Sequence, residues 1–412
     1  MEYHRLVWVL FVFVLFMHDG WGQTDRRQRQ REKQQRRLAE LSRATTSFGV
    51  SLYRQLASRN QENIVFSPLS IYTALSMTML GTYGETKNQL KRVLSLRPRQ
   101  GVHRALNAVF ASFPRSPAAN VTLRLANAVY YDDADVVLHD GFTRGLRRHY
   151  GAYPKAFERP NPETPINDWV LRQTGGKIED FLNPGDITSD TVIMLLNAVF
   201  FQGTWKDIFD ERYTREGDFT TTSGDVVSVP MMSRDGSYSV KAVGDGIPAR
   251  VLELPYGSDD RFAMFILLPD EANGLRELEG RLSSQVLEEA VTNMPEQYRY
   301  QVRMPKFNMR TKMLLKDTLE AMGLTRFFKD ADLTRMVRQS NRGPLSVDSV
   351  IHEAVLEVDE KGTHAAAVTA IGVSVLSLPP QFAVTHPFLI VLRDKKASIN
   401  LFMARVNDPS SE

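Results

Sequence analysis

The 412-residue sequence contains no cysteine. Disulfide bonds, thiol nucleophiles and thiolate-ligated metal sites are therefore excluded for this chain. With 42% hydrophobic and 24% charged residues, the chain is long enough to bury a large core. We expect it to fold without metals or disulfides and to draw its stability from the size of that core.

The sequence also lacks an apolar run that could span a bilayer. The N-terminal run, Leu6–Met17, has twelve residues, whereas a spanning helix needs about 20. Arg5 precedes this run, and Gly20-Trp21-Gly22 follows it as a small-x-small cleavage site. These features predict that residues 1–22 are a signal peptide, that cleavage occurs near Gly22 and that the protein is secreted. A membrane anchor is the alternative interpretation.

Motifs of common enzyme classes are missing as well. The segment that begins at His352 reads H-E-A-V-L, so Leu356 stands where the metalloprotease pattern requires a second histidine. There is no G-x-S-x-G motif, and TGGKI at 174–178 lacks the glycine spacing of a phosphate-binding loop. We therefore expect that the protein is not an enzyme and that it has no cofactor or metal. We also expect a monomer without a nucleic acid partner.

Positive charge is concentrated in residues 23–43, where eight Lys and Arg stand against three acidic residues, whereas residues 44–412 carry a net charge of −1. Because this stretch is rich in Arg and Gln and poor in apolar residues, it is predicted to be a disordered or loosely helical arm. Such an arm suits an anionic polymer such as heparin or heparan sulfate; a solvated tail without a partner is the alternative. The candidate heparin-binding residues are Arg26, Arg27, Arg29, Arg31, Lys33, Arg36 and Arg37.

One modification signal follows from the predicted secretion. Asn120-Val121-Thr122 is the only N-x-Ser/Thr sequon of the chain with an allowed middle residue. Asn120 is therefore a predicted glycan acceptor.

Residues 44–412 show no linker or repeat and are predicted to form a single α+β domain. Ser67 is a predicted helix N-cap, with Pro68 at the first position of a helix that is apolar almost all round. The run at 191–201 is typical of a strand covered on both faces. Further strand pairs are predicted within 250–270 and within 386–409, the second as a hairpin that closes the chain.

Four segments, in this order and spacing, resemble the serpins: NIVFSPLSIYTALSMTMLG (63–81), VIMLLNAVFFQGTWKDIFD (192–210), VIHEAVLEVDEKGTHAAAVTA (350–370) and HPFLIVLRDKKASINLFMARVNDP (386–409). The resemblance covers residues 44–408, and EKGT followed by LSLPP is most similar to the extracellular antitrypsin and antichymotrypsin group. It implies a serpin fold with three β-sheets and eight or nine helices. It also implies an exposed reactive-centre loop at about 362–380.

The resemblance implies that a target protease attacks this loop and that the freed segment then inserts as a new strand of the main sheet. Alternate side chains of such a strand face the core, and the small Thr363, Ala365, Ala367 and Thr369 form the inward set. His364 and Val368, which depart from the usual family hinge, fall on the outward set. The hinge residues implied by the family motif are Glu360, Gly362, Thr363, Ala365, Ala366, Ala367 and Thr369.

The family's loop length implies a reactive bond between Leu376 and Ser377, because seventeen residues run from the hinge Glu360 to Leu376. A register shift would place Val375 or Ser377 in the protease's primary pocket. Leucine suits serine proteases with an apolar pocket, such as chymotrypsin, cathepsin G, chymase or some elastases.

Other positions match motifs that control sheet opening in the family. Ser67, Ser70, Asn197 and His352 are implied to form a hydrogen-bonded cluster beneath the main sheet. Lys306 and Glu360 are implied to form an ion pair where the loop enters the sheet, and Trp205 belongs to the same region.

Two alternatives share the fold. One is a non-inhibitory serpin, a carrier or chaperone, although such members tend to have bulky, charged or Pro residues in the hinge and GTHAAAVT has none. The other is a heparin-dependent thrombin-type inhibitor, which also uses leucine but needs an acidic arm.

Overall fold

The structure is a computed structural model that describes residues 2–97, 101–113, 121–362 and 379–411, with side chains from residue 28 onward. The predicted glycan acceptor, reactive bond and most of the hinge lie outside the described residues: Asn120, Thr363, Ala365, Ala366, Ala367, Thr369, Leu376 and Ser377. The side chains of Arg26 and Arg27 are likewise not described. No helix in the described part of the chain is both long and apolar enough to cross a bilayer.

The described strands form three sheets. The five-stranded sheet has the order β11 (Phe307–Leu314), β13 (Ser349–Val358), β5 (Ile193–Gly203), β2 (Val121–Tyr131) and β4 (Lys155–Ala156). The nine-stranded sheet contains β1 (Ile64–Phe66), β16 (Ile399–Val406), β15 (Phe388–Asp394), β9 (Phe262–Pro269), β8 (Ala249–Tyr256), β7 (Val226–Ala242), β10 (Tyr298–Pro305), β14 (Gln381–Ala383) and β6 (Arg215–Thr220). β3 (Val136–Leu138) and β12 (Val337–Ser340) form the two-stranded sheet.

Ten α-helices and one 3-10 helix, η2 (Glu211–Tyr213), occur in the described residues. The predicted α+β class with three sheets is confirmed, and the helix count exceeds the expected eight or nine because two helices are very short. The α-helices are α1 (Glu2–Ala57), α2 (Pro68–Met79), α3 (Gly84–Val93), α4 (Val102–Ser112), α5 (Asp140–Tyr150), α6 (Glu163–Thr174), α7 (Leu275–Arg281), α8 (Ser284–Val291), α9 (Lys316–Ala321) and α10 (Arg326–Lys329).

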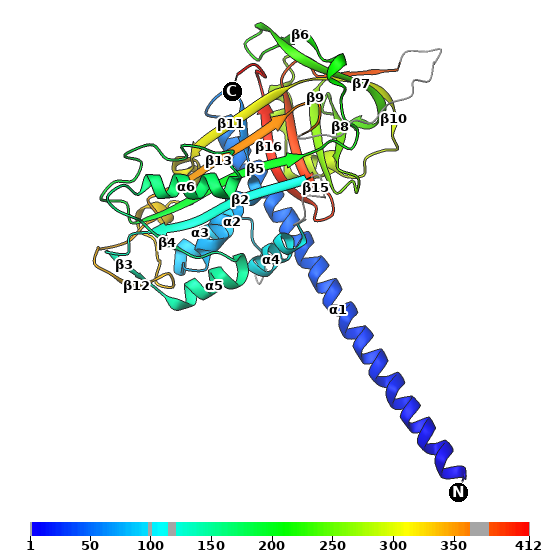
Figure 1. Cartoon of the computed structure of the whole chain (residues 1–412), viewed down its shortest axis with the longest axis vertical. Coiled ribbons are helices and arrows are strands. Elements are labelled where there is room, and N and C mark those ends of the chain that lie inside the picture. Colours follow the sequence, from blue (N-terminus) through cyan, green and yellow to red (C-terminus); the bar gives the residue numbers. More distant parts are fainter. Residues whose placement is uncertain (1, 98–100, 114–120, 363–378, 412) are drawn as a thin grey trace.

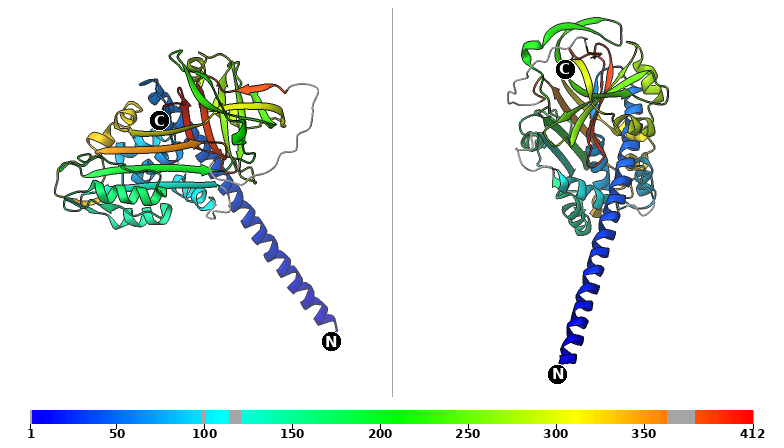
Figure 2. Two further views of the ribbon diagram at one scale, coloured as in Figure 1. Left: turned by 45° about the horizontal axis from the view of Figure 1, so that its top comes forward. Right: turned by 90° about the vertical axis from the view of Figure 1, so that its right-hand side faces the viewer.

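Residues 23–43, which were predicted to be disordered or loosely helical, lie inside the single helix α1. The reason is local: the segment contains no Gly or Pro before Gly49, and Arg, Gln, Lys and Glu are good helix formers. Residues 28–36 are exposed, whereas Leu41 and the following turns of α1 are buried. Figures 1 and 2 show α1 as a rod that leaves the body of the molecule.

β5 is covered on both faces, as its apolar run predicts. Alternate side chains of a strand face opposite sides, and Leu195, Val199 and Phe201 join the cluster that contains α2. Met194, Leu196, Ala198 and Phe200 join a second cluster with Ile166 and Val170 of α6. The five-stranded sheet therefore lies between α2 on one face and α6 on the other.

The other local predictions are also confirmed. The Ser67 side chain caps α2 by accepting from Ser70 N, Pro68 opens the helix, and the residues of α2 are buried. β8 pairs with β9, and β15 pairs with β16 as the predicted C-terminal hairpin.

Candidate functional site

The predicted site residues gather along the line between β5 and β13. These neighbouring strands run parallel and pair from Met194 opposite Ser349 to Phe201 opposite Leu356. We call this line the β5–β13 seam. Because the strands are parallel, both start at one end of the seam, which we call its base, and both finish at the other end, which we call its top.

A polar cluster lies in the middle of the seam, on the face covered by α2. His352 of β13 lies opposite Asn197 of β5 in the strand register, and Asn127 of β2 lies opposite Asn197 on its other side. Asn197 Nδ2 donates to Ser70 Oγ and to Asn127 Oδ1, and Ser70 Oγ donates to Asn127 Oδ1 at 3.3 Å. The cluster therefore joins three adjacent strands to the first turn of α2.

His352 is fully buried, and its two ring nitrogens have different partners. Ser67 N donates to Nε2 at 3.1 Å, so Nε2 must carry a lone pair. The proton is then on Nδ1, which donates to Asn197 Oδ1. Burial lowers the pKa of His352 to about 3, which agrees with a neutral ring at physiological pH.

At the top of the seam, the chain after β5 holds the chain after β13. Trp205 Nε1 donates to Asp359 O at 2.9 Å, and Trp205 N donates to Lys361 O at 3.1 Å. Trp205 is 3% exposed, and its ring stacks on Tyr256 with 4.2 Å between ring centroids. The buried indole thus fixes the position at which residues 359–362 leave the sheet.

Glu360 lies in the same region and is 5% exposed. Its carboxylate accepts from Lys306 Nζ at 3.0 Å and from Thr214 Oγ1 at 2.8 Å. Burial opposes ionisation, but hydrogen bonds from its own backbone N–H, Lys306 and Thr214 together lower the pKa of Glu360. The ion pair implied by the motif is therefore present, and the carboxylate is ionised at neutral pH.

Gly362 is the last described residue before the predicted loop insertion segment. Its φ is +86°, and a Cβ there would lie 2.5 Å from Gly203 O and 2.5 Å from Trp205 N. Only glycine fits this close approach of two backbones. On the other side of 363–378, β14 pairs in parallel with β10 in the nine-stranded sheet. The two described ends of the loop are thus anchored on different sheets.

The structure brings the predicted residues into two groups: Ser67, Ser70, Asn197 and His352 in the middle of the seam, and Trp205, Lys306, Glu360 and Gly362 at its top. Sequence reasoning missed Asn127 and Thr214. A polar residue inside the apolar run of β2 was a signal for Asn127, whereas Thr214 carried none.

Comparisons with known proteins support the same family as the motifs. Residues 43–409 match the sequence model of a family described as Serpin (serine protease inhibitor). Serpin B4 of Homo sapiens is 34% identical over 398 residues, which cover 90% of this chain and 100% of that protein. Serpin A3-6 of Bos taurus is 32% identical over 378 residues, which cover 90% of this chain and 89% of that protein.

A solved structure agrees with these sequence matches. Serpin48, described as a highly specific serpin in the insect Tenebrio molitor, matches with a TM-score of 0.79 at 27% identity. The match covers 90% of this chain and 98% of that one. Because the sequence relatives carry both Serpin A and Serpin B names, the comparisons support the family and not one group within it.

Proposed function

The chain belongs to the serpin family, and we propose that it inhibits serine proteases of apolar primary specificity as a suicide substrate. The observation that supports this proposal most directly is where the two described ends of the loop lie. The hinge residue Gly362 lies at the top of a seam where β5 and β13 pair directly, while the other end of the loop is anchored at β14 in a different sheet. Cleavage of the loop would free the Gly362 end to enter the seam.

The proposed reaction is an arrested proteolysis. The protease's serine Oγ attacks the Leu376 carbonyl carbon, the Leu376–Ser377 peptide bond breaks, and the amine of Ser377 leaves with a proton. An ester then joins Leu376 to the enzyme. Insertion of residues from Thr363 onward displaces the attached protease, and displacement of catalytic groups by even about 1 Å can slow deacylation on the order of a hundredfold.

Insertion needs the seam to open and the new strand to fit. The small inward set Thr363, Ala365, Ala367 and Thr369 leaves room beneath the neighbouring strands. A strand that enters a sheet gains backbone hydrogen bonds worth about 1 kcal/mol each net, so a dozen residues supply a large driving force. GTHAAAVT therefore favours the inhibitor over the carrier or chaperone alternative.

Secretion and heparin binding belong to the same proposal. Residues 1–22 have the pattern of a cleaved signal peptide. Arg29, Arg31, Lys33 and Arg36 are exposed on α1, and Arg37 is partly buried, so at least four cations are accessible to a sulfated polymer as an activator. Since this arm is basic, a thrombin-type mechanism that needs an acidic arm is disfavoured.

The test is to mix the purified protein with chymotrypsin and to analyse the products on a denaturing gel. We expect a complex that resists SDS and a released C-terminal fragment that begins at Ser377. Chymotrypsin whose catalytic serine has been blocked is the control and should give neither product. Complete loop cleavage without any covalent complex would instead support a non-inhibitory serpin.

A further inference from the structure

The base of the seam is tied by polar contacts that the proposed function does not use. Asp348 immediately precedes β13, and its Oδ2 accepts from Val192 N at 2.7 Å and from Ile193 N at 2.9 Å. Asp348 N in turn donates to Ile193 O at 2.8 Å. One residue thus makes three hydrogen bonds across the seam, two of them to a charged oxygen, at the point where β5 begins.

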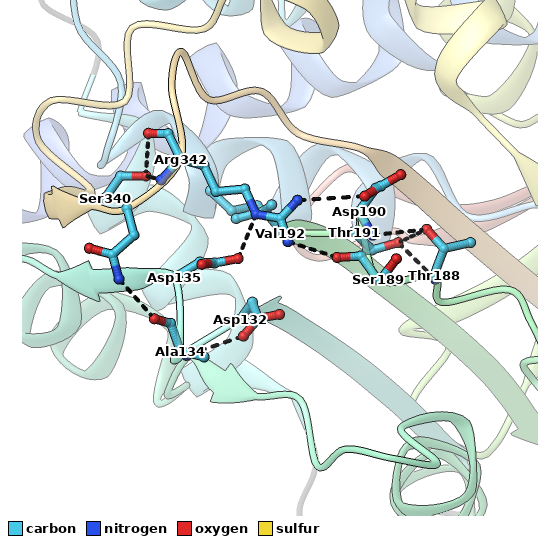
Figure 3. A network of polar contacts seen from close by, with 12 residues as sticks. Asp132, Ala134, Asp135, Thr188, Ser189, Asp190, Thr191, Val192, Ser340 and Arg342 are labelled. Atoms are coloured by element: carbon cyan, nitrogen blue, oxygen red, sulfur yellow. Dashed lines mark hydrogen bonds and ion pairs between the residues drawn. The ribbon is translucent and has the colours of Figure 1, made fainter.

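Arg342 makes a second tie, and Figure 3 shows its contacts with Ser189 and Asp135. Its Nη2 donates to Ser189 O at 2.9 Å, and its Nε donates to Asp135 Oδ2 at 2.6 Å. Ser189 belongs to the segment before β5, and Asp135 belongs to the turn between β2 and β3. Asn341 N also donates to Asp135 O at 2.9 Å. The chain that leads into β13 is therefore held to two other segments at the base.

Complete loop insertion has to break the tie at Asp348. The fourteen residues from Thr363 to Leu376 would extend over about 46 Å as a strand, at roughly 3.3 Å per residue. β13 has ten residues and extends over about 33 Å by the same rise. Residues 359–362 continue the chain for about 13 Å beyond β13 at the same rise. A strand that turns back after Gly362 therefore reaches the start of β13 and has to separate the start of β5 from Asp348.

We propose that Asp348 is a positioning residue for inhibition, which keeps the base of the seam closed until the last part of the loop inserts. Arg342 supports it by holding residues 341–342 in place. This inference rests on the proposed function, since it concerns the same insertion step. In this view, contacts at the top and in the middle of the seam control early insertion. Contacts at the base control complete insertion.

The test measures how fast the intact protein takes up a synthetic peptide of residues 363–376, followed by native gel electrophoresis. Asp348→Ala removes both hydrogen bonds to the carboxylate from the closed state only, so we expect uptake to be faster on the order of tenfold. Asp348→Asn keeps one acceptor oxygen but loses its charge, so it should restore only part of the slower wild-type rate. Asp133→Asn removes an exposed carboxylate from the same end and should change nothing.

A second readout separates this role from a general structural one. In the cleaved and inserted form the tie is already broken, so Asp348→Ala should lower the melting temperature of the intact protein and leave that of the cleaved protein unchanged. An equal loss in both forms, or peptide uptake at the wild-type rate, would overturn the inference. If Asp348→Ala does not fold, Arg342→Ala carries the same prediction with a smaller acceleration.

The wild type separates this inference from the proposed function. A wild type that neither takes up peptide nor forms a covalent protease complex would overturn both. A wild type that does both, combined with an Asp348→Ala variant that is no faster, would overturn only the role of Asp348.

Discussion

His352 shows how one buried side chain can hold two strands and a helix together. Its ring accepts from the backbone of Ser67 before α2 and donates to Asn197 of β5. Protonation of Nε2 would place its N–H against the N–H of Ser67, so that two donors face each other. Burial also disfavours the charged ring, and both effects keep His352 neutral. The middle of the seam should therefore weaken when His352 is forced to take a proton.

We predict that acid destabilises the native state through His352. Its pKa is about 3 in the folded chain and about 6.5 in the unfolded chain. Stability from this group is fully present above the unfolded value and is lost as the pH falls toward the folded value, with a slope of up to about 1.4 kcal/mol per pH unit. Urea unfolding between pH 7 and pH 4 measures this slope.

His352→Gln removes the titration and should flatten that pH dependence, although stability at pH 7 should fall because the hydrogen bonds fit less well. The variant has to be compared with the wild type because His103, His149 and His386 also have lowered pKa values. These three residues add to the dependence of wild-type stability on pH. The exposed His139 gives the matched control His139→Gln. Parallel curves for His352→Gln and the wild type would refute this role.

A second prediction at single-residue level concerns specificity. The side chain that enters the protease's primary pocket selects the enzyme. Leu376→Arg should therefore abolish inhibition of chymotrypsin and confer inhibition of trypsin, with a stoichiometry near one because the hinge is unchanged. Titration of both proteases against the two proteins measures this exchange. Efficient trapping of trypsin by the wild type would show that the register of the reactive bond is wrong.

The sequence predicted single residues well where a family motif contains both partners, as for Lys306 and Glu360. It missed Asn127, although this residue faces Asn197 in the strand register. The reason is that a cross-strand neighbour depends on strand order, which no local pattern encodes. Asp348 was missed because its partners are backbone N–H groups, which leave no trace in side-chain identity.

Among the elements, α1 combines a buried end with an exposed, basic stretch. Arg29, Lys33 and Arg36 recur at spacings of four and three residues, so they lie along one side of the helix. Arg36 also pairs with Glu40 at 3.2 Å, a contact on the surface with little effect on stability. The helix thus places these basic side chains in a cationic stripe along one side.

We predict that this stripe supplies heparin affinity. Deletion of residues 23–36, which ends before the buried turns of α1, removes six cations and should sharply lower the salt concentration at which the protein elutes from immobilised heparin. Inhibition of chymotrypsin without heparin is the control and should not change. Unchanged elution would move the site to the folded body, where Arg144, Arg147 and Arg148 of α5 are exposed.

A further prediction concerns the loop hinge, the segment that would enter the seam first. Thr363 directly follows Gly362 and, under the proposed function, would be the first inward side chain of the inserting strand. Thr363→Arg would bury an unpaired guanidinium, which opposes insertion and leaves the protease time to hydrolyse its ester. We expect the variant to be cleaved as a substrate with little covalent complex on denaturing gels. A yield of complex equal to that of the wild type would contradict insertion from this end.

For the whole molecule, the sequence predicted the class and the local elements, while it could not predict which strands are neighbours. Local signals predicted two elements that the structure contains. Ser67 and Pro68 marked the start of α2, and an apolar run marked the buried strand β5. The seam itself joins residues about 150 positions apart, as in the pairing of Asn197 with His352. Only the motif resemblance linked such distant segments, because non-local pairing leaves no periodic pattern in the sequence.

Under the proposed function, the closed β5–β13 seam is a metastable arrangement that loop cleavage relieves. A new strand between β5 and β13 would replace the single row of backbone hydrogen bonds between them with two rows, one to each strand. The net gain is about a dozen bonds at about 1 kcal/mol each. The unfolding entropy of a domain of this size is on the order of 0.8 kcal/mol per kelvin, so the melting temperature should rise on the order of 15 °C.

The most direct measurement is therefore the melting temperature before and after a protease that is not inhibited cuts within 363–378. We expect a large rise in the melting temperature of the cleaved protein. A melting temperature that stays the same or falls after complete cleavage would show that the seam does not accept the loop and that inhibition by loop insertion is wrong for this protein.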